Sequence, residues 1–507
     1  MRLKELLDGL TVINLLGDSE IEIAGLAYDS RTVKPGYLFV ALKGRAEDGH
    51  DFIENAIDNG ALALVAERFK RSDTRATMVQ VPDSRMALSR LAANYYDQPF
   101  KGINLIGITG TNGKTTCSYI LESILFAAGA KPGVIGTINY RLSGQTWEAP
   151  VTTPESLDLM HTLRQMADGG VSDVVIEVSS HALHQGRARD CPFQVAIFTN
   201  ISRDHLDYHG SMGDYFEAKS LLFKDLGKKG SRHLRWAVIN TDDPKGKELI
   251  MLTKATVVTY GLGRDCDFRA EGVQVTRNGL IATLISPVGE VEIKSSLIGD
   301  FNIYNILAAS AAALCLGYDL NVVATGIERL KGVPGRLELV NNSQSLAIVV
   351  DYAHTPDALL KAIKAVKPLV VGRLITVFGC GGDRDRGKRS EMGHVAAENS
   401  DLVFVTSDNP RTEDPSAIAS QIEEGVLESG IKKLEDPSDE ELAGPGYILD
   451  LDRANAIRRA VELADERDLV LIAGKGHEDY QIIGKEKRHF DDREVAAEAV
   501  RYLAHKP

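Results

Sequence analysis

A glycine-rich loop between a predicted strand and a predicted helix constrains this chain more than any other segment. Residues 107–116 read GITGTNGKTT; they follow the apolar run 103–108 and precede the amphipathic stretch 115–128. Glycines let backbone N–H groups converge on phosphate oxygens, Lys114 supplies a cation toward the β- and γ-phosphates, and Thr115 offers a hydroxyl to magnesium. The positive end of the following helix adds to the attraction. The segment therefore predicts a nucleotide site of the P-loop type.

The loop departs from the standard P-loop spacing at one position. Ile108 stands where the first glycine usually lies, and Gly107 comes one residue earlier. A simple glycine-rich turn before a helix is the alternative interpretation, and it would account for an isolated pair of glycines. It does not account for glycines, a lysine and threonines that stand together between a strand and a helix. We therefore expect the loop to bind ATP.

Chain length and two breaks in the sequence pattern predict three domains. Single hydrophobic cores stop growing at roughly 250 to 300 residues, whereas this chain has 507 residues. Glycine and proline interrupt the pattern at 98–102 and again at 332–335. The predicted domains therefore span residues 1–100, 101–335 and 336–507.

The alternation of strand-like and helix-like segments predicts an α/β fold. The central domain should be P-loop ATPase-like with a mainly parallel sheet. The first domain has only short apolar runs, such as 37–42 and 61–66, and should be a small mixed α/β domain. The last domain should be Rossmann-like. Its predicted strands are 346–350, 374–378, 402–406 and 469–473, and its predicted helices are 356–366, 388–399, 416–427 and 453–465.

Charge and cysteine content narrow the class of partners. A net charge of −13 opposes attraction to nucleic acids and anionic membranes. The five cysteines lack the paired spacing of a disulfide framework or zinc site, which fits a reducing compartment. The longest apolar stretch, 306–316, is shorter than the ~20 residues of a membrane span, and the start of the chain lacks a signal-peptide core. We expect a cytoplasmic monomer that binds small molecules, with no nucleic acid and no membrane insertion.

Two polar clusters follow predicted buried strands and point to a metal site. Glu177 ends the strand-like run 173–177, and the polar segment 200–210 follows the apolar run 195–198. Strand carboxyl ends in α/β sheets face ligands, so both clusters should lie near the loop. Each residue alone would more often be structural, but together they offer carboxylate, imidazole and hydroxyl ligands for magnesium.

An ordered series of motifs along nearly the whole chain resembles the Mur ligase family, whose members extend the peptide of the peptidoglycan precursor. After GTNGKTT in the loop, the matching motifs are DSR at 29–31, TTP at 152–154, EVSSH at 177–181, RDHLD at 203–207, NTDD at 240–243, GDFN at 299–302, PGR at 334–336, DYAH at 351–354, GGDRD at 381–385, DNPR at 408–411 and GKGHE at 474–478. Chance agreement at so many ordered sites is negligible.

The resemblance implies an ADP-forming acid–amino-acid ligase of peptidoglycan synthesis, and thus of cell-wall biogenesis, cell shape and cell division. The γ-phosphate of ATP would pass to the free γ-carboxylate of D-glutamate in UDP-N-acetylmuramoyl-L-alanyl-D-glutamate. An incoming amine would then attack the acyl-phosphate and release phosphate. Cations are needed to bring the two anions together. The three domains would bind the UDP-muramoyl substrate, ATP and the amino acid, in that order.

The resemblance also assigns roles to individual residues. The catalytic set is Lys114, Glu177, His205 and Lys219. The Mg²⁺ ligands are Thr115, Glu177, His205 and Lys219, the last carbamylated by CO₂. The ATP set is Gly110, Thr111, Asn112, Gly113, Lys114, Thr115, Thr116, Asn302, Arg336, Asp351 and His354. The UDP-muramoyl-dipeptide set is Ser30, Arg45, Ala46, Glu47, Thr152, Thr153, Ser179, Gln185 and Arg187. The diaminopimelate set is Arg384, Asp408, Asn409, Pro410, Arg411, Gly474 and Glu478.

Without the resemblance, several of these residues have simpler interpretations. Lys219 would be a solvated helix lysine, and Asn302 and Asn305 would cap or polarise a helix start. Asp351 would cap the helix that follows it, and the loop 474–478 would be a strand-to-helix connector.

The arginine of the DNPR motif indicates which amino acid is added. Within the family, Arg411 resembles the form found in enzymes that add meso-2,6-diaminopimelate, whereas lysine-adding members usually differ there. Diaminopimelate carries a second carboxylate, which Arg411 and Arg384 could grip with forked, charge-assisted hydrogen bonds. Lysine would leave both arginines unpaired. Glu478 could pair with the ammonium of the same amino acid.

Rival functions remain open at this stage. A lysine-adding or folate-polyglutamylating ligase would share the loop and the chemistry, although Arg411 disfavours the first and the motif at 29–31 disfavours the second. A P-loop nucleotide-binding regulator without ligase activity belongs to another class. The presence of Glu177, His205 and Lys219 beside the loop motif disfavours it.

Overall fold

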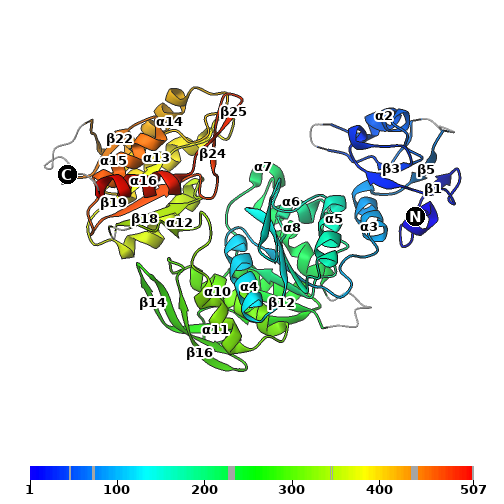
Figure 1. The fold of residues 1–507 in the computed structure, drawn as a ribbon, viewed down its shortest axis with the longest axis horizontal. Helices are drawn as coiled ribbons and strands as arrows, with labels where there is room; N and C mark the ends of the chain where they lie inside the picture. The colour runs from blue at the N-terminus through cyan, green and yellow to red at the C-terminus, as the bar shows by residue number, and fades with distance from the viewer. Residues whose placement is uncertain are drawn as a thin grey trace. The chain divides into compact units, whose positions relative to one another are not determined.

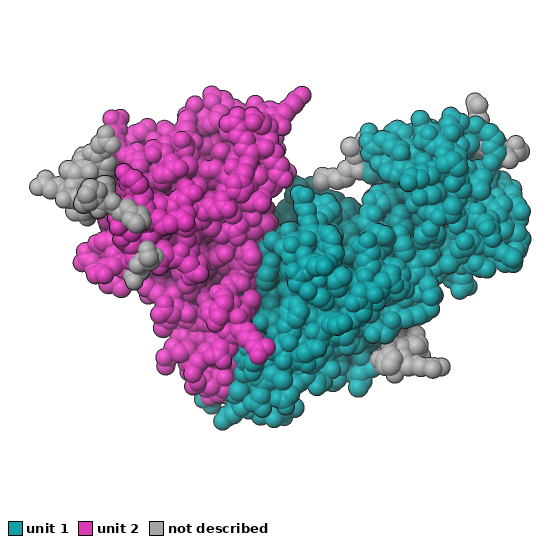
Figure 2. Space-filling model, in the orientation of Figure 1, with its two compact units in different colours: residues 1–269, 284–291, 304–326 teal, residues 270–283, 292–303, 327–507 magenta. Residues whose placement is uncertain are grey.

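The computed structural model of this chain describes residues 1–44, 47–70, 75–226, 234–342, 344, 346–435 and 444–504. It is an α/β protein with an N-terminal, a central and a C-terminal domain, as predicted (Figure 1). Contacts divide the chain into two compact units (Figure 2). Unit 1 comprises Met1–Arg269, Leu284–Val291 and Tyr304–Gly326, and unit 2 comprises Ala270–Thr283, Glu292–Ile303 and Ile327–Pro507.

The N-terminal domain is built on a mixed five-stranded sheet in the order β1-β5-β4-β3-β2. β1 pairs antiparallel with β5, and the other pairs are parallel, so the sheet is mixed, in line with the predicted small mixed α/β domain. The strands are β1 Asn14–Leu16, β2 Gly25–Ala27, β3 Tyr37–Val40, β4 Ala63–Ala66 and β5 Thr77–Gln80. The helices are α1 Leu3–Leu6, η1 Ser30–Thr32, η2 Gly49–Phe52, α2 Ile53–Asp58 and α3 Ser84–Tyr95.

The central domain contains an eight-stranded sheet in the order β13-β12-β11-β6-β10-β7-β8-β9. Its strands are β6 Asn104–Thr109, β7 Pro132–Ile135, β8 Asn139–Leu142, β9 Gln145–Glu148, β10 Asp173–Glu177, β11 Val195–Phe198, β12 Trp236–Asn240 and β13 Thr256–Tyr260. All pairs from β13 to β7 are parallel. The carboxyl ends of β6, β10 and β11 therefore meet at one edge, where α/β sheets bind ligands.

Helices and a small separate sheet complete the central region. The helices are α4 Lys114–Ala127, α5 Ser156–Asp168, α6 Ser180–His184, α7 Leu206–His209, α8 Met212–Asp225, α9 Pro244–Leu252, α10 Asn302–Cys315 and α11 Leu320–Arg329. The three-stranded sheet is β14 Arg269–Thr276, β15 Gly279–Ser286 and β16 Gly289–Ser295. Residues 306–315 of the apolar stretch 306–316 belong to α10, which is largely buried. Among the described residues, no helix is both long and apolar enough to cross a membrane.

The C-terminal domain has a seven-stranded sheet in the order β17-β18-β23-β19-β20-β22-β21, parallel except for β17. Its strands are β17 Glu338–Leu339, β18 Ala347–Asp351, β19 Leu374–Phe378, β20 Leu402–Val405, β21 Lys432–Lys433, β22 Gly446–Leu449 and β23 Leu469–Ala473. A hairpin of β24 Tyr480–Ile483 and β25 Glu486–His489 follows. The helices are α12 Pro356–Val366, η3 Lys367–Leu369, α13 Gly387–Asn399, α14 Pro415–Glu428, α15 Arg453–Glu462 and α16 Asp492–Ala504.

The start of α12 corrects one simple interpretation. The cap of this helix is Thr355, whose hydroxyl accepts from the N–H of Ala358. Asp351 instead accepts from the N–H groups of Leu337 and Ala353, at 2.8 Å each. The interpretation of Asp351 as the helix cap is therefore wrong, because its side chain binds the residue before β17 and the turn after β18.

Candidate functional site

The loop after β6 has the backbone shape that a phosphate cradle needs. Gly110 and Gly113 have φ angles of +153° and +88°. A Cβ at Gly110 would lie 1.8 Å from the Thr199 hydroxyl, and one at Gly113 would lie 2.3 Å from the Asn305 side-chain oxygen. No other residue fits these positions. The helix α4 begins at Lys114 without a side-chain cap, so the loop leads directly into its positive end.

The rest of the loop is held by its neighbours. The N–H of Thr111 donates to the carbonyl of Asn200 at 2.9 Å, and the N–H of Asn112 donates to the Asn200 side chain at 3.0 Å. The Thr111 hydroxyl contacts the Tyr215 hydroxyl at 3.1 Å. Thr116 is buried in the first turn of α4. The segment after β11 therefore fixes the loop, as the predicted proximity of the two strand ends requires.

Two lysines converge on one carbonyl of the loop. Lys114 Nζ donates to the carbonyls of Gly110 and Thr111 at 2.9 and 3.0 Å, and Lys219 Nζ donates to the same Gly110 carbonyl at 2.8 Å. Lys219 lies on α8 and is 1% exposed, so its interpretation as a solvated helix lysine is wrong. Burial, and then the neighbouring Lys114, lower the pKa of Lys219 well below its ordinary value. Burial and a neighbouring cation therefore disfavour the charged form of this lysine.

Glu177 stands at the end of β10, 1% exposed, behind the loop. Its Oε2 accepts hydroxyl protons from Thr115 at 3.0 Å and Thr137 at 2.8 Å. Its Oε1 accepts from the Thr137 N–H at 3.2 Å and from the Ser118 hydroxyl at 3.4 Å. The strand end and the loop therefore form one polar group of hard oxygen donors.

These donors fit a magnesium ion that arrives with nucleotide. Magnesium usually takes one or two carboxylates and completes its shell with water and substrate phosphates. Glu177 and Thr115 are such donors. Within the described part of the chain, no group of three or more His, Cys, Asp or Glu side chains is arranged to hold a metal. The described side chains therefore do not provide a complete coordination shell for a metal ion by themselves.

His205 lies in a cluster of aromatic rings beside the loop. It has a φ of +53° and directly precedes α7. Its ring centroid is 4.9 Å from that of His181 and 6.0 Å from that of Tyr215. Burial, with smaller contributions from Lys114 and Lys219, lowers the pKa of His205, and burial lowers that of His181 to about 4. Both rings are therefore biased toward the neutral form, in which imidazole binds metals.

The residues predicted to line the path of the muramoyl dipeptide form one network in the central domain. The Thr153 hydroxyl donates to the Glu177 carbonyl at 2.7 Å and accepts from the N–H of Ser179 at 3.0 Å. Arg187 donates to the Thr153 carbonyl at 2.9 Å and to the side chain of Gln185 at 2.7 Å. Arg187 is half-buried. Thr152, which precedes Thr153 in the TTP motif, contacts Thr137 through the two hydroxyls at 3.1 Å.

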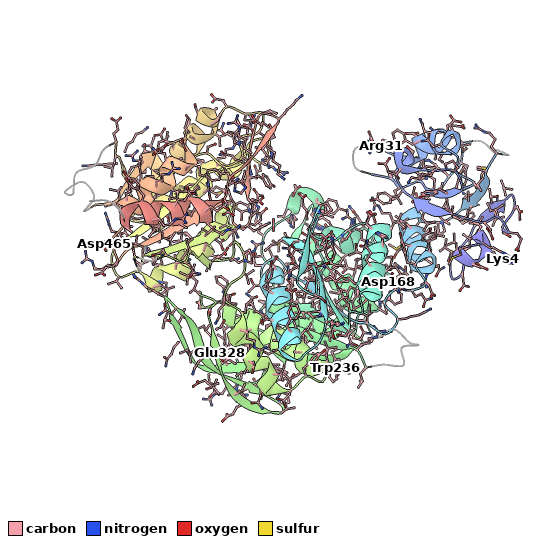
Figure 3. All side chains as sticks on the ribbon, in the orientation of Figure 1. Lys4, Arg31, Asp168, Trp236, Glu328 and Asp465 are labelled. Atoms are coloured by element: carbon pink, nitrogen blue, oxygen red, sulfur yellow. The ribbon has the colours of Figure 1, made fainter. Side chains whose placement is uncertain are left out.

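The residues predicted to bind the UDP end of the muramoyl substrate, Ser30 and 45–47, belong to the N-terminal domain. Ser30 is buried and begins η1, and its carbonyl accepts from the Asn59 side chain at 2.9 Å. Asp29 caps this short helix and pairs with Arg31, which is labelled in Figure 3, at 2.7 Å. Glu47 is exposed. The predictions for Arg45 and Ala46 fall outside the described residues.

The remaining ATP residues belong to the second unit. Arg336 stacks over the Tyr352 ring at 4.8 Å, and the ring of His354 contacts the Tyr352 carbonyl at 2.8 Å. Asp351 joins the turns around them, as described above. Asn302 begins α10, and its side-chain amide donates to the Ile298 carbonyl at 2.7 Å. The helix-start interpretation of Asn302 thus has structural support, and its predicted contact with adenine stays a prediction.

Two arginines of the predicted amino-acid site lack an acidic partner. Arg411 has a φ of +51°, and its guanidinium donates to the Gly382 carbonyl at 2.8 Å. Arg384 is exposed in the preceding loop. Among the described residues, neither forms an ion pair with a carboxylate. These guanidinium groups are therefore available to a carboxylate from outside the chain.

The acidic side of this site combines a buried carboxylate, Asp408, with a half-buried one, Glu478. Glu478 Oε2 accepts from the Asn409 side chain at 2.9 Å. Burial, and then Asp408, raise the pKa of Glu478. Gly474 has a φ of +116°, and a Cβ there would lie 3.2 Å from an Asp408 oxygen. Pro410 is buried as well. The family resemblance assigns the loops after β20 and β23 to one amino-acid site. The hydrogen bond between Asn409 and Glu478 shows that these two loops are in contact.

Sequence reasoning missed several contacts of these sites. Thr137 and Ser118 touch Glu177, Tyr215 touches the loop, and His181 packs on His205. The signal was present for His181, because it ends the EVSSH motif. Thr137 and Tyr215 stand outside the quoted motifs, and only the fold brings them to the site.

The P-loop at the end of β6, a buried carboxylate behind it and a Rossmann-like domain define a multidomain nucleotide-binding enzyme of the P-loop class. Family models match residues 22–96 (Mur ligase family, catalytic domain), 108–313 (Mur ligase middle domain) and 335–476 (Mur ligase, glutamate ligase domain). The chain belongs to the Mur ligase family.

Individual relatives agree with this assignment. The UDP-N-acetylmuramoyl-L-alanyl-D-glutamate–2,6-diaminopimelate ligase of Geobacter sulfurreducens is 48% identical over 503 residues, covering 99% of both chains. A solved structure of a ligase with the same name is 33% identical, covers 100% of both chains and has a TM-score of 0.72. The MurF ligase of Thermotoga maritima, solved with ADP, is 21% identical with a TM-score of 0.60 over 95% of this chain and 97% of that one, and thus shares the fold.

Proposed function

We propose that this chain adds meso-2,6-diaminopimelate to the D-glutamate of UDP-N-acetylmuramoyl-L-alanyl-D-glutamate, with ATP cleaved to ADP and phosphate. The single observation that carries the proposal is the similarity to ligases of that name over 99% of the chain. The arginines and acids at the ends of β19, β20 and β23 support the choice of amino acid. As a peptidoglycan-precursor enzyme, it would act in the cytoplasm as a monomer.

The chain's own residues prepare the first step, in which an oxygen of the γ-carboxylate attacks the γ-phosphorus of ATP and ADP leaves. The glycine loop and Lys114 hold the phosphates and offset the repulsion between two anions. Thr115, Glu177, His205 and carbamylated Lys219 would hold Mg²⁺, which supplies charge neutralisation at the phosphoryl group when bound. Asn302, Arg336, Asp351 and His354 contribute the rest of ATP binding.

Lys219 has the environment that carbamylation requires. Carbon dioxide adds to a neutral amine, and the carbamate that forms is an anion, with one proton released. Burial, and then the neighbouring Lys114, lower the pKa of Lys219 and so favour the neutral form of its amine. Its place beside Gly110 and Tyr215 puts a carbamate next to the loop. A cation would thereby become a metal-binding carboxylate.

The second step forms the amide. The neutral amine of the amino acid attacks the acyl-phosphate carbon, the C–O bond to phosphate breaks, and the amine gives up a proton. Arg187, Thr152, Thr153, Ser179 and Gln185 would orient the dipeptide, with Ser30 and residues 45–47 at its uridine end. Arg384 and Arg411 would hold the distal carboxylate of diaminopimelate, and Asp408 and Glu478 its ammonium, with Asn409, Pro410 and Gly474 shaping the pocket.

A competition between amino acids tests the proposal. Phosphate release is measured with ATP, the UDP-linked dipeptide and either meso-diaminopimelate or L-lysine, and the product mass is determined. Turnover should depend on the dipeptide and favour diaminopimelate. Equal turnover with lysine would contradict the specificity, and no release with either amino acid would contradict ligase activity.

A further inference from the structure

A fully buried lysine joins the two loops of the proposed amino-acid site. Lys475 follows β23 in the GKGHE motif, and its side chain is 0% exposed. Its Nζ lies 3.3 Å from Asp408 Oδ1, 3.2 Å from Asn409 Oδ1 and 3.8 Å from Glu478 Oε2. A buried ammonium costs several kcal/mol in lost hydration unless its partners compensate. These three partners provide that compensation.

The charge balance of this group matters for an incoming amino acid. Asp408 and Glu478 are two carboxylates in one partly buried site, which raises the cost of ionising both. Lys475 neutralises one of the two negative charges. One negative charge then remains for the ammonium of a ligand. Removing Lys475 would change both the charge and the position of the acidic groups.

The same group ties the β24–β25 hairpin to the DNPR loop. Asn409 Oδ1 accepts from the Ile482 N–H at 2.9 Å, in addition to Lys475. The N–H of Arg411 donates to the Ile482 carbonyl at 3.1 Å, and the N–H of Gly484 donates to the Arg411 carbonyl at 2.7 Å. The hairpin therefore holds Arg411 in its left-handed conformation. Asn409 binds the same hairpin through Ile482 and also contacts Lys475.

We propose that Lys475 is a positioning residue for the amino acid: it fixes Asp408, Asn409 and Glu478, and through Asn409 the hairpin that holds Arg411. The inference rests on the proposed function for the identity of the amino acid. Lys475 acts through these neighbours and is not a catalytic residue. Its effect should therefore appear mainly in the KM for the amino acid, with the P-loop of the central domain unaffected.

A second ion pair in the same domain provides a matched control. Arg373 and Asp468 precede β19 and β23, at the opposite end of the strands that carry the site. Their side chains pair at 2.6 Å, and Asp468 is 2% exposed. Arg373→Met therefore removes a cation from a buried carboxylate without touching the loops at 408–411 or 474–478. It reports the effect of lost stability alone.

The experiment compares Lys475→Met with Arg373→Met by steady-state kinetics and thermal unfolding. Lys475→Met should raise the KM for the amino acid about tenfold or more, because buried hydrogen-bonded groups lose a charged partner, and should change the KM for ATP by a much smaller factor. Arg373→Met should lower Tm and leave both KM values unchanged. A Lys475→Met enzyme that matches Arg373→Met, with a lowered Tm and the original amino-acid KM, would overturn the proposal.

Two provisions keep the test decisive. If Lys475→Met does not fold, Lys475→Gln keeps hydrogen-bond donors on its side-chain amide but not the charge, and should also raise the amino-acid KM, by a smaller factor. An unchanged KM in this variant would equally overturn the proposal. The KM is measured for whichever of meso-diaminopimelate and L-lysine the unaltered enzyme uses. A preference for lysine would contradict the proposed function while the role of Lys475 is still tested.

Discussion

The surroundings of Lys219 and Lys475 differ more than their burial does. Both side chains are 1% exposed or less. Lys219 donates to the Gly110 carbonyl and has no carboxylate within ion-pair distance among the described residues, whereas Lys475 contacts Asp408 and Glu478. A lysine buried among carbonyls and another cation is driven toward the neutral amine. A lysine buried between carboxylates serves as their counter-ion. Burial of a lysine therefore does not by itself indicate its chemistry.

Lys114, the cation that shares the Gly110 carbonyl with Lys219, should give the largest effect. Lys114→Ala should lower turnover about 1,000-fold or more, because the phosphates lose their main protein cation. It should also raise the pKa of Lys219, since Lys114 is one of the causes that lower it. Phosphate release measures the first effect. Lys245→Ala, which removes a surface lysine paired with Glu248, is the control and should keep normal turnover.

Removing Lys219 should raise the stability of the protein and lower its turnover. The pKa of Lys219 is lowered in the folded chain relative to the unfolded chain, so this group lowers stability as pH falls below its ordinary pKa of 10.5. In buffer free of bicarbonate, where Lys219 is a free amine, Lys219→Met should therefore raise Tm at pH 7 by about 2 °C or more, and the gain should shrink toward pH 10. Turnover should fall about 100-fold with the loss of a metal-binding group.

Labelled carbon dioxide tests the same lysine directly. With ¹³C-bicarbonate, the unaltered protein should show a carbamate carbonyl resonance by NMR, and Lys219→Met should not. Lys475→Met should keep the resonance, because its lysine is paired with carboxylates and is not the site of carbamylation. A signal that persists in Lys219→Met would contradict the distinction between the two lysines.

Arg411→Ala should have an intermediate and selective effect. The loss of a forked, charge-assisted contact with a carboxylate should raise the KM for diaminopimelate about 10- to 100-fold. The KM for ATP should be unchanged. Discrimination against L-lysine should decrease, because lysine has no distal carboxylate to lose. An unchanged KM for diaminopimelate would contradict the proposed role of Arg411.

The smallest effect is expected at an exposed charge. Arg31 pairs with Asp29, but its side chain is 86% exposed, so solvent screens the interaction. Arg31→Ala should leave Tm within about 1 °C of the original value. Thermal unfolding in low and high salt checks this expectation. A large decrease in Tm would mean that an exposed charged group can contribute strongly to stability, contrary to this expectation.

The sequence identified local features better than long-range ones. The P-loop is contiguous, so its glycines, lysine and threonines could be recognised together, and the helix 356–366 was predicted with its observed bounds because Pro356 and its apolar periodicity define it. The position of Glu177 behind the loop followed from the rule for strand carboxyl ends.

The contacts of Lys475 could not be found in the same way. Its partners Asp408 and Asn409 lie 67 and 66 residues earlier in the chain. The β24–β25 hairpin is exposed along β25 and has no strong apolar pattern, so it was not predicted. Burial of a charged side chain has no signature in the sequence, because the neighbours that bury and pair it come from other segments.

Oxygen labelling tests the central claim most directly, namely that the carboxylate of the substrate is phosphorylated before the amide forms. The UDP-linked dipeptide is prepared with ¹⁸O in the γ-carboxylate of its glutamate, and the phosphate released during turnover with diaminopimelate is analysed by mass spectrometry. The acyl-phosphate route predicts that one labelled oxygen is transferred to each phosphate. Release of unlabelled phosphate alongside amide product would contradict it.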